Sequence, residues 1–128
     1  MFGLKKKTNY GLELMIFLGK NFGKGPIALR EVAKAKKLPF KFLEQIAIPL
    51  RESKLVEAKE GKGGGYFLKR KPKEISVAEI VEVLEGPVEV CQCFDCPIAS
   101  GCGQKDFWGE IGEKVKEAIE DKTLGDLI

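Results

Sequence analysis

The 128-residue sequence contains no histidine. Histidine is the commonest general acid or base near neutral pH, and no nucleophile stands beside a base at a catalytic spacing. No apolar run approaches the length of a membrane span. The apolar stretch at residues 12–18 is short, contains Glu13 and lacks a small-residue cleavage site, which argues against a signal peptide. We therefore expect a cytoplasmic protein that is not an enzyme, has no small-molecule substrate and does not associate with membranes.

Cysteine is present but tightly confined. The four cysteines, Cys91, Cys93, Cys96 and Cys102, lie within twelve residues. In a reducing compartment, clustered cysteines more often bind metal or carry out redox chemistry than form structural disulfides. Iron–sulfur clusters and zinc both accept thiolates, but zinc sites usually combine two Cys-x-x-Cys pairs and only Cys93 and Cys96 form one here. An iron–sulfur cluster, zinc and a metal-free thiol switch all remain open on spacing alone.

Charge is unevenly distributed along the chain. Residues 1–75 contain 18 Lys and Arg against seven Asp and Glu, a balance of +11, whereas residues 76–128 contain four against twelve, a balance of −8. A basic half joined to an acidic half is typical of a polyanion-binding module with a second functional part. Solvated faces that segregate without a partner are the alternative.

Three helices are expected in the first half, over residues 8–21, 28–37 and from Pro39 to about residue 51. Pro39 fits the first turn of the third helix, and Pro49 is expected to kink or shorten its end. The pattern of this helix places one set of residues inward and another outward. The inward set is Leu43, Ile46, Ala47 and Leu50, and the outward set is Lys41, Glu44, Gln45 and Arg51.

Residues 54–70 read as two short strands around a tip at 61–65 that is rich in glycine, which predicts a β-hairpin. Three helices followed by a basic hairpin are typical of a winged helix-turn-helix, a mostly α fold with a small β-hairpin. In that architecture the third helix enters the major groove of double-stranded DNA. The predicted contacts near base edges are Pro39, Lys41, Glu44 and Gln45, and those of the wing are Lys59 and Lys62.

Four further basic residues, Lys69, Arg70, Lys71 and Lys73, lie on elements expected to face DNA. A small α+β domain with solvated lysines is the alternative to DNA binding.

Ser76 and Glu79 match a capping box that starts a fourth helix. After the cysteines, apolar residues recur at helical spacing up to Asp121, and they are Trp108, Ile111, Val115 and Ala118. This pattern predicts a long helix that pairs with a second subunit, although a helix folded back on its own domain would also fit. The expected organisation is a winged helix-turn-helix at 1–87, a cysteine loop at 88–105, and a C-terminal dimerisation helix and tail at 106–128.

Several short motifs occur together along nearly the whole chain: Thr8-Asn-Tyr-Gly-Leu, Leu43-Glu-Gln-Ile, Gly61-Lys-Gly-Gly-Gly-Tyr, Glu85-Gly, Trp108 and Thr123-Leu-Gly-Asp-Leu. With these motifs the sequence resembles the Rrf2 family of bacterial winged-helix regulators, whose best-known branches are the iron–sulfur cluster assembly regulator and the nitric-oxide-sensitive repressor. The resemblance implies a homodimer in which the cysteine loop lies near the partner's first helix. It also implies a cluster bound by Cys91, Cys96 and Cys102 with a variable fourth ligand.

The sequence departs from those branches at three positions. Lys105 stands where one branch keeps a histidine ligand, and Asn9 stands where the other keeps an aspartate supplied by the partner. Glu60 replaces an arginine common at the wing, so the resemblance gives Lys62 more of that contact. The fourth ligand is therefore open among Cys93, a solvent or thiol ligand, and a partner side chain.

These observations predict a homodimeric transcription regulator whose DNA affinity is controlled by an iron–sulfur cluster of two or four irons that senses redox state, nitric oxide or iron. The alternative is an iron–sulfur or zinc-binding carrier or interaction protein without a DNA-sensing role.

Overall fold

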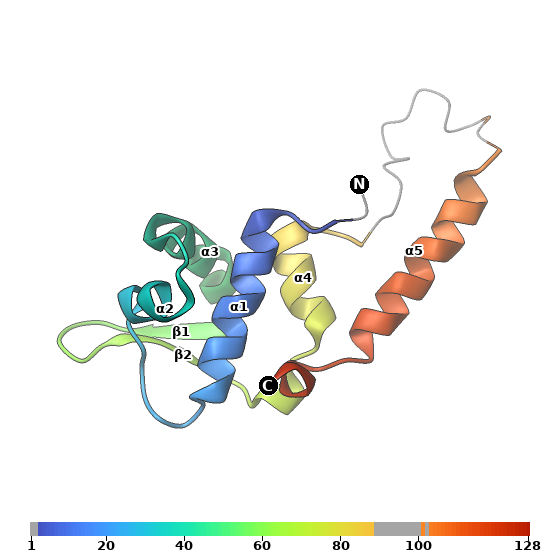
Figure 1. Cartoon of the computed structure of the whole chain (residues 1–128). Helices are drawn as coiled ribbons and strands as arrows, with labels where there is room; N and C mark the ends of the chain where they lie inside the picture. Colours follow the sequence, from blue (N-terminus) through green and yellow to red (C-terminus); the bar gives the residue numbers. More distant parts are fainter. Residues whose placement is uncertain (1–2, 89–100, 102) are drawn as a thin grey trace.

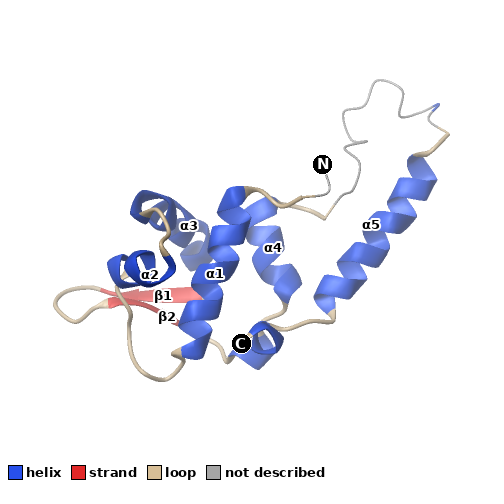
Figure 2. Cartoon of the chain, in the orientation of Figure 1, coloured by secondary structure: helices blue, strands red, loops and turns tan. Residues whose placement is uncertain are grey.

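The computed structural model describes residues 3–88, 101 and 103–128, and the predictions made for the four cysteines lie outside this part of the chain. The order of elements is α1 (Lys6–Lys20), α2 (Leu29–Lys36), α3 (Phe40–Glu52), β1 (Val56–Lys59), β2 (Gly65–Leu68), the short 3₁₀ turn η1 (Pro72–Glu74), α4 (Val77–Glu85), α5 (Lys105–Glu120) and a second 3₁₀ turn η3 (Leu124–Leu127). Figure 2 shows a mostly helical molecule with one hairpin, which confirms the predicted winged-helix class.

Helix α1 runs through the centre of the fold and packs against both α3 and α4 (Figure 1). Leu14 and Met15 are fully buried, and Leu18 is almost so. Gly11 marks the closest approach to α4, because a Cβ there would stand 2.2 Å from a methyl carbon of Leu84. This helix is therefore buried on two sides, against α3 and against α4.

The turn between α2 and α3 sets the angle of the third helix. Lys37 ends α2 in the left-handed conformation, with φ 56° and ψ 43°. Pro39 is the N-cap of α3 rather than a residue of its first turn, and its carbonyl accepts the first helical hydrogen bond from Leu43 at 3.1 Å. The predicted shortening at Pro49 does not occur, since α3 continues past it to Glu52, although proline has no N–H to donate to the helix.

The wing, residues 56–68, is an antiparallel pair in which Val56 lies opposite Leu68 and Lys59 opposite Gly65. A third backbone segment joins it, because Ile27 and Tyr66 exchange two hydrogen bonds of 2.9 and 2.8 Å. Gly65 is required at this junction: its φ is +151°, and a Cβ would stand 2.3 Å from the Ile27 carbonyl. The wing is thus fixed to the segment that leads into α2.

Helix α4 begins with the predicted capping box, in which the Ser76 hydroxyl accepts from the Glu79 N–H and the Glu79 carboxylate accepts from the Ser76 N–H. The end of the chain returns to this point. The Leu124 N–H donates to the Ile75 carbonyl, the Val77 N–H donates to the Lys122 carbonyl, each at 2.8 Å, and Leu124 is fully buried. The tail predicted together with the C-terminal helix therefore adds to the core of the winged helix.

Helix α5 lies at the edge of the molecule, where it packs against α4 (Figure 1). Gly112 is its one buried residue. Within the described residues no helix is long and apolar enough to cross a membrane.

Candidate nucleic-acid interface

The outer face of α3 carries the polar residues that the sequence pattern assigned to base edges. Lys41, Glu44 and Gln45 are exposed, whereas Leu43 and Leu50 on the opposite face are fully buried. Pro39 is exposed at the start of the helix. A lysine, a carboxylate and an amide on one accessible helix face are donors and acceptors of the kinds that read the major groove.

Ile48 belongs to the same face and was not predicted from the sequence. It is 58% exposed, although it sits between the buried residues Ala47 and Leu50. It follows Lys41 by seven residues, or two helical turns, and Gln45 by three, which places the three side chains on one face. An isoleucine there can contact the methyl group of thymine. This spacing could have placed Ile48 on the outer face from the sequence alone. It was overlooked because isoleucine is usually assumed to face inward.

The first turn of α3 is braced by aromatic contacts from α1 and α2. The Arg30 guanidinium lies 4.2 Å from the centre of the Phe40 ring, and Tyr10 meets Phe42 edge to face at 5.3 Å. Pro39 provides no side-chain cap. The N–H groups of this turn therefore remain available to an anion such as a DNA phosphate, at the favourable end of the helix dipole.

The wing tip offers two lysines. Lys59 and Lys62 are exposed, and neither of them, nor Lys41, takes part in any of the four ion pairs formed among the described residues. Two other predicted cations are engaged within the protein. Lys69 pairs with Glu57 at 3.3 Å, and Arg70 pairs with Glu79 at 3.0 Å. Lys71 and Lys73 are exposed and, like Lys41, Lys59 and Lys62, lie outside the four ion pairs of the described residues, so these five lysines remain available to phosphates.

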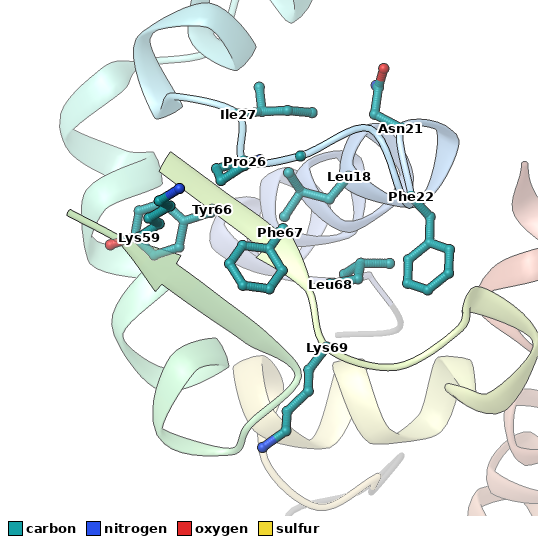
Figure 3. A pocket seen from close by; sticks show the side chains of 12 residues that line it. Leu18, Asn21, Phe22, Pro26, Ile27, Lys59, Tyr66, Phe67, Leu68 and Lys69 are labelled. Carbon is teal, nitrogen blue, oxygen red and sulfur yellow. The ribbon is translucent and has the colours of Figure 1, made fainter. Parts of the chain in front are cut away.

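A hollow of about 410 Å³ lies between β2 and the connection from α1 to α2 (Figure 3). Its lining is largely apolar and includes Phe22, Phe67 and Leu68, with Lys59 and Lys69 as its cations. None of its described lining residues is Cys, His, Asp or Glu, so it offers no ligand set for a metal. In residues 3–88, 101 and 103–128 as a whole, no three such residues converge on a common point.

Helices α1 and α5 carry the two positions at which the sequence departs from the expected ligands of a cluster. Asn9 on α1 and Lys105 at the start of α5 are both exposed. At the end of α4, the Glu85 carboxylate accepts hydrogen bonds from the Thr8 hydroxyl and from the Lys5 N–H at 3.2 Å. The Thr8 hydrogen bond, only partly offset by burial, holds the pKa of Glu85 below its ordinary value, with help from the Lys5 N–H. This contact fixes the point from which the chain leaves α4.

The apolar stripe on α5 is only partly covered by its own chain. Trp108 and Ile111 are half-buried, whereas Val115 is 42% exposed and Ala118 is exposed. Phe107, which the sequence pattern did not assign to this stripe, is 56% exposed and meets Trp108 edge to face at 4.9 Å. The Trp108 indole N–H donates to the Gln104 side chain at 2.6 Å. Part of the stripe is therefore exposed in the single chain.

The chain is similar to known transcriptional regulators over almost its whole length. Residues 4–128 match the family model described as Rrf2, iron-dependent transcriptional regulator. The transcriptional regulator CymR of Bacillus subtilis is 36% identical over 97% of this chain and 88% of its own, and IscR of Sodalis glossinidius is 27% identical over 98% and 78%.

Solved structures of the same two kinds of regulator share the fold. The structure of CymR, titled the global cysteine regulator of B. subtilis, covers 99% of this chain and 96% of its own with a TM-score of 0.82 and 38% identity. A structure titled T. potens IscR covers 98% and 85% with a TM-score of 0.80 and 32% identity.

Proposed function

Since the chain belongs to the Rrf2 family of transcriptional regulators, we propose that it works as a homodimer in the cytoplasm and that an iron–sulfur cluster controls its affinity for operator DNA. It is a DNA-binding transcription regulator and not an enzyme, as the names of its relatives indicate.

The observation that carries the DNA-binding surface is the combination of free cations and an accessible polar helix face. Lys41, Glu44 and Gln45 project from α3, and Lys59 and Lys62 stand on the wing without an ion-pair partner among the described residues. We assign Gln45 and Glu44 to base edges, where an amide suits adenine and a carboxylate suits cytosine. Lys41, Lys59 and Lys62 are assigned to phosphates, which makes binding dependent on salt.

The partner is a second copy of the chain, held by the α5 stripe. Val115 and Ala118 are exposed on a helix that buries a single residue within its own subunit. Pairing two stripes removes this apolar surface from water and brings two α3 helices into one assembly. Two recognition helices must be separated by about one turn of DNA, roughly 34 Å, to reach successive major grooves.

The donor set of the chain fits an iron–sulfur cluster. Four thiols fall within residues 91–102, and the described remainder brings no competing set of ligands together. Cys91, Cys96 and Cys102 would hold the cluster, with Cys93 as the candidate fourth ligand, because Asn9 and Lys105 are poor ligands. When bound, the cluster supplies iron that responds to oxidants, nitric oxide and iron supply.

The residues around the cysteine loop explain how its state could reach the DNA-binding surface. Glu85, which precedes the loop, is bonded to Thr8, and Leu124, which follows α5, is buried in the core. The loop and α5 therefore lie between two points that are anchored to the winged helix. A loop held by its cysteines would restrict where α5 begins. The position of α5 in turn sets the distance between the two α3 helices of a dimer, to which operator affinity is sensitive.

The decisive experiment purifies the protein without oxygen, measures its iron, sulfide and absorption spectrum, and titrates a duplex selected by the protein from a random pool. The titration is repeated at the same salt after the iron has been removed. We expect the two forms to differ in affinity, and equal affinities would refute control by a cluster. The variant Cys93→Ala, compared with Cys91→Ala, tests the fourth ligand: Cys93→Ala should alter the spectrum while Cys91→Ala should abolish it.

A second candidate is favoured by the 36% identity to a relative whose structure is titled the global cysteine regulator. In that case the protein would regulate genes of cysteine metabolism without iron, and the cysteine loop would act as a thiol switch. Iron-free protein that binds the selected duplex tightly, and releases it on thiol oxidation, would favour this function. An iron–sulfur or zinc carrier would instead ignore DNA and donate its metal to an apo-acceptor.

A further inference from the structure

The base of the wing is fastened to α4 by a single arginine. Arg70 follows β2 by two residues, and its guanidinium makes a two-pronged contact with the Glu79 carboxylate, with Nη1 to Oε1 at 3.0 Å and Nη2 to Oε2 at 3.4 Å. The same Nη2 also donates to the Glu74 carbonyl in η1. A planar guanidinium used in this forked way has fixed geometry, unlike a lysine ammonium.

Glu79 is itself held in place from the other side. Its carboxylate accepts from the Ser76 N–H at 2.9 Å, and its own N–H donates to the Ser76 hydroxyl at 3.1 Å. Burial opposes the charge, but the hydrogen bonds from Arg70 and the Ser76 backbone keep the pKa of Glu79 below its ordinary value. The Ser76 contacts thus orient the Glu79 carboxylate, and Arg70 and Ser76 together stabilise its charge.

The anchor point is also paired with the end of the chain. The Ser76 segment lies beside Thr123 in an isolated β-bridge, flanked by backbone hydrogen bonds to Lys122 and Leu124. At this end Val56 and Leu68 pack into the core, whereas the ion pair of Lys69 with Glu57 joins the two sides of the wing to each other. Arg70 thus connects the base of the wing to the start of α4, which is itself paired with the tail.

We propose that Arg70 is a positioning residue for DNA binding, which aims the wing by holding its base against Glu79 and does not itself contact DNA. This rests on the DNA-binding surface proposed above. The basic character of Arg70 groups it with Lys62 in the sequence, but the structure separates the two. Lys62 is exposed at the tip and unpaired among the described residues, whereas Arg70 directs its guanidinium toward acceptors of its own chain.

Removal of the Glu79 charge distinguishes two possible roles of Arg70, a direct phosphate contact and the positioning of the wing. If Arg70 contacted a phosphate, Glu79→Gln would release it and remove a repelling charge, so DNA affinity would be unchanged or higher. If Arg70 aims the wing, Glu79→Gln should weaken DNA binding as Arg70→Gln does. The double variant should then be no weaker than the worse of the two single variants, because both remove the same contact.

The test measures the affinity of the full-length protein for a selected duplex at several salt concentrations between about 50 and 200 mM. The slope of log affinity against log salt over this range reports the number of phosphate contacts. We expect Arg70→Gln and Glu79→Gln each to lose about tenfold in affinity, a size typical of coupled pairs. Arg70→Lys should lose nearly as much, because it keeps the charge and loses the fork. Lys62→Ala is the direct-contact comparison and should lower the salt slope by about 0.9.

Thermal unfolding and circular dichroism of each variant show whether the fold survives at the assay temperature. A loss of affinity that tracks the unfolded fraction would overturn the proposal, and so would full rescue by Arg70→Lys or tighter binding by Glu79→Gln. If Lys62→Ala weakens binding while the Arg70 and Glu79 variants do not, only this inference fails. If the wild-type protein selects no duplex at all, the proposed function fails as well.

Discussion

Helices α1 and α5 are almost equal in length, with 15 and 16 residues, yet α1 buries six residues and α5 buries one. Helix α1 lies between α3 and α4, whereas α5 packs along α4 and turns much of its apolar stripe outward. Their charges also differ, because α1 carries three lysines and one glutamate and α5 three lysines and five acidic residues. Both have helical apolar periodicity, so periodicity alone does not say whether the partner lies in the same chain.

This difference assigns separate tasks to the two regions. A helix with buried apolar residues stabilises its own subunit, whereas exposed apolar residues on α5 become stabilising only when a second surface covers them. The basic region also presents its free lysines at α3 and the wing, away from the acidic α5. Variants that damage one region and spare the other can break this assignment.

The largest effect on subunit stability is expected at the tail. Leu124 is fully buried and Leu127, three residues later, is 42% exposed. Leu124→Ala should lower the free energy of unfolding by about 3 kcal/mol, in the range for fully buried leucines. Leu127→Ala is the matched control and should cost less than about 1 kcal/mol. Chemical denaturation measures both, and equal losses would show that the tail does not belong to the core.

The junction between the wing and Ile27 should be the next most sensitive. Gly65→Ala places a Cβ 2.3 Å from the Ile27 carbonyl, whereas Gly63→Ala, at φ +77°, meets no atom within 4 Å. Gly63→Ala should cost about 1 kcal/mol through backbone strain alone, and Gly65→Ala about 2–3 kcal/mol because it also separates the backbones. Gly65→Ala should weaken DNA binding beyond its effect on folding. Identical behaviour of the two variants would argue against the Ile27 junction.

A smaller effect is expected from single lysines on DNA. Lys41→Ala should reduce the slope of log affinity against log salt by about 0.9, as the loss of one phosphate contact requires. Lys114 is an exposed lysine on acidic α5, so Lys114→Ala should leave the slope unchanged. A titration series at four salt concentrations measures both slopes. An equal change in slope for the two variants would mean that only the net charge of the protein matters and that Lys41 on α3 does not contact a phosphate.

The smallest effect is on acid stability. The pKa values of Glu79 and Glu85 lie below the ordinary 4.5 in the folded chain. For Glu79 burial raises the pKa, but the hydrogen bond from Arg70 helps to lower it, and for Glu85 the hydrogen bond from Thr8 lowers it. A lowered folded pKa contributes stability that is present above pH 4.5 and is lost as the pH falls through the folded value. Thr8→Val should raise the pKa of Glu85 and leave that of Glu79 unchanged. Carboxyl titration by NMR measures both, and an unmoved Glu85 would refute the Thr8 contact.

The sequence predicted features that depend on neighbours along the chain. The capping box at Ser76, the hairpin and the inward face of α3 follow from local spacing, and the structure agrees with each. Features that depend on distant segments were not predicted. The burial of Leu124 requires the tail to meet Ile75, and the engagement of Arg70 requires β2 to end beside α4.

Ile48 and Phe107 were missed for another reason: an apolar residue is assumed to face a core, whereas both are exposed, on the surfaces that we propose for DNA and for a second subunit.

The central claim is that the basic region binds DNA while the α5 stripe pairs two chains. Sedimentation velocity of wild-type protein and of Val115→Asp on one labelled, protein-selected duplex tests both parts at once. We predict two wild-type chains per duplex, and for Val115→Asp a folded single chain with much weaker binding. One wild-type chain per duplex, or two chains of Val115→Asp bound as tightly as wild type, would contradict the claim.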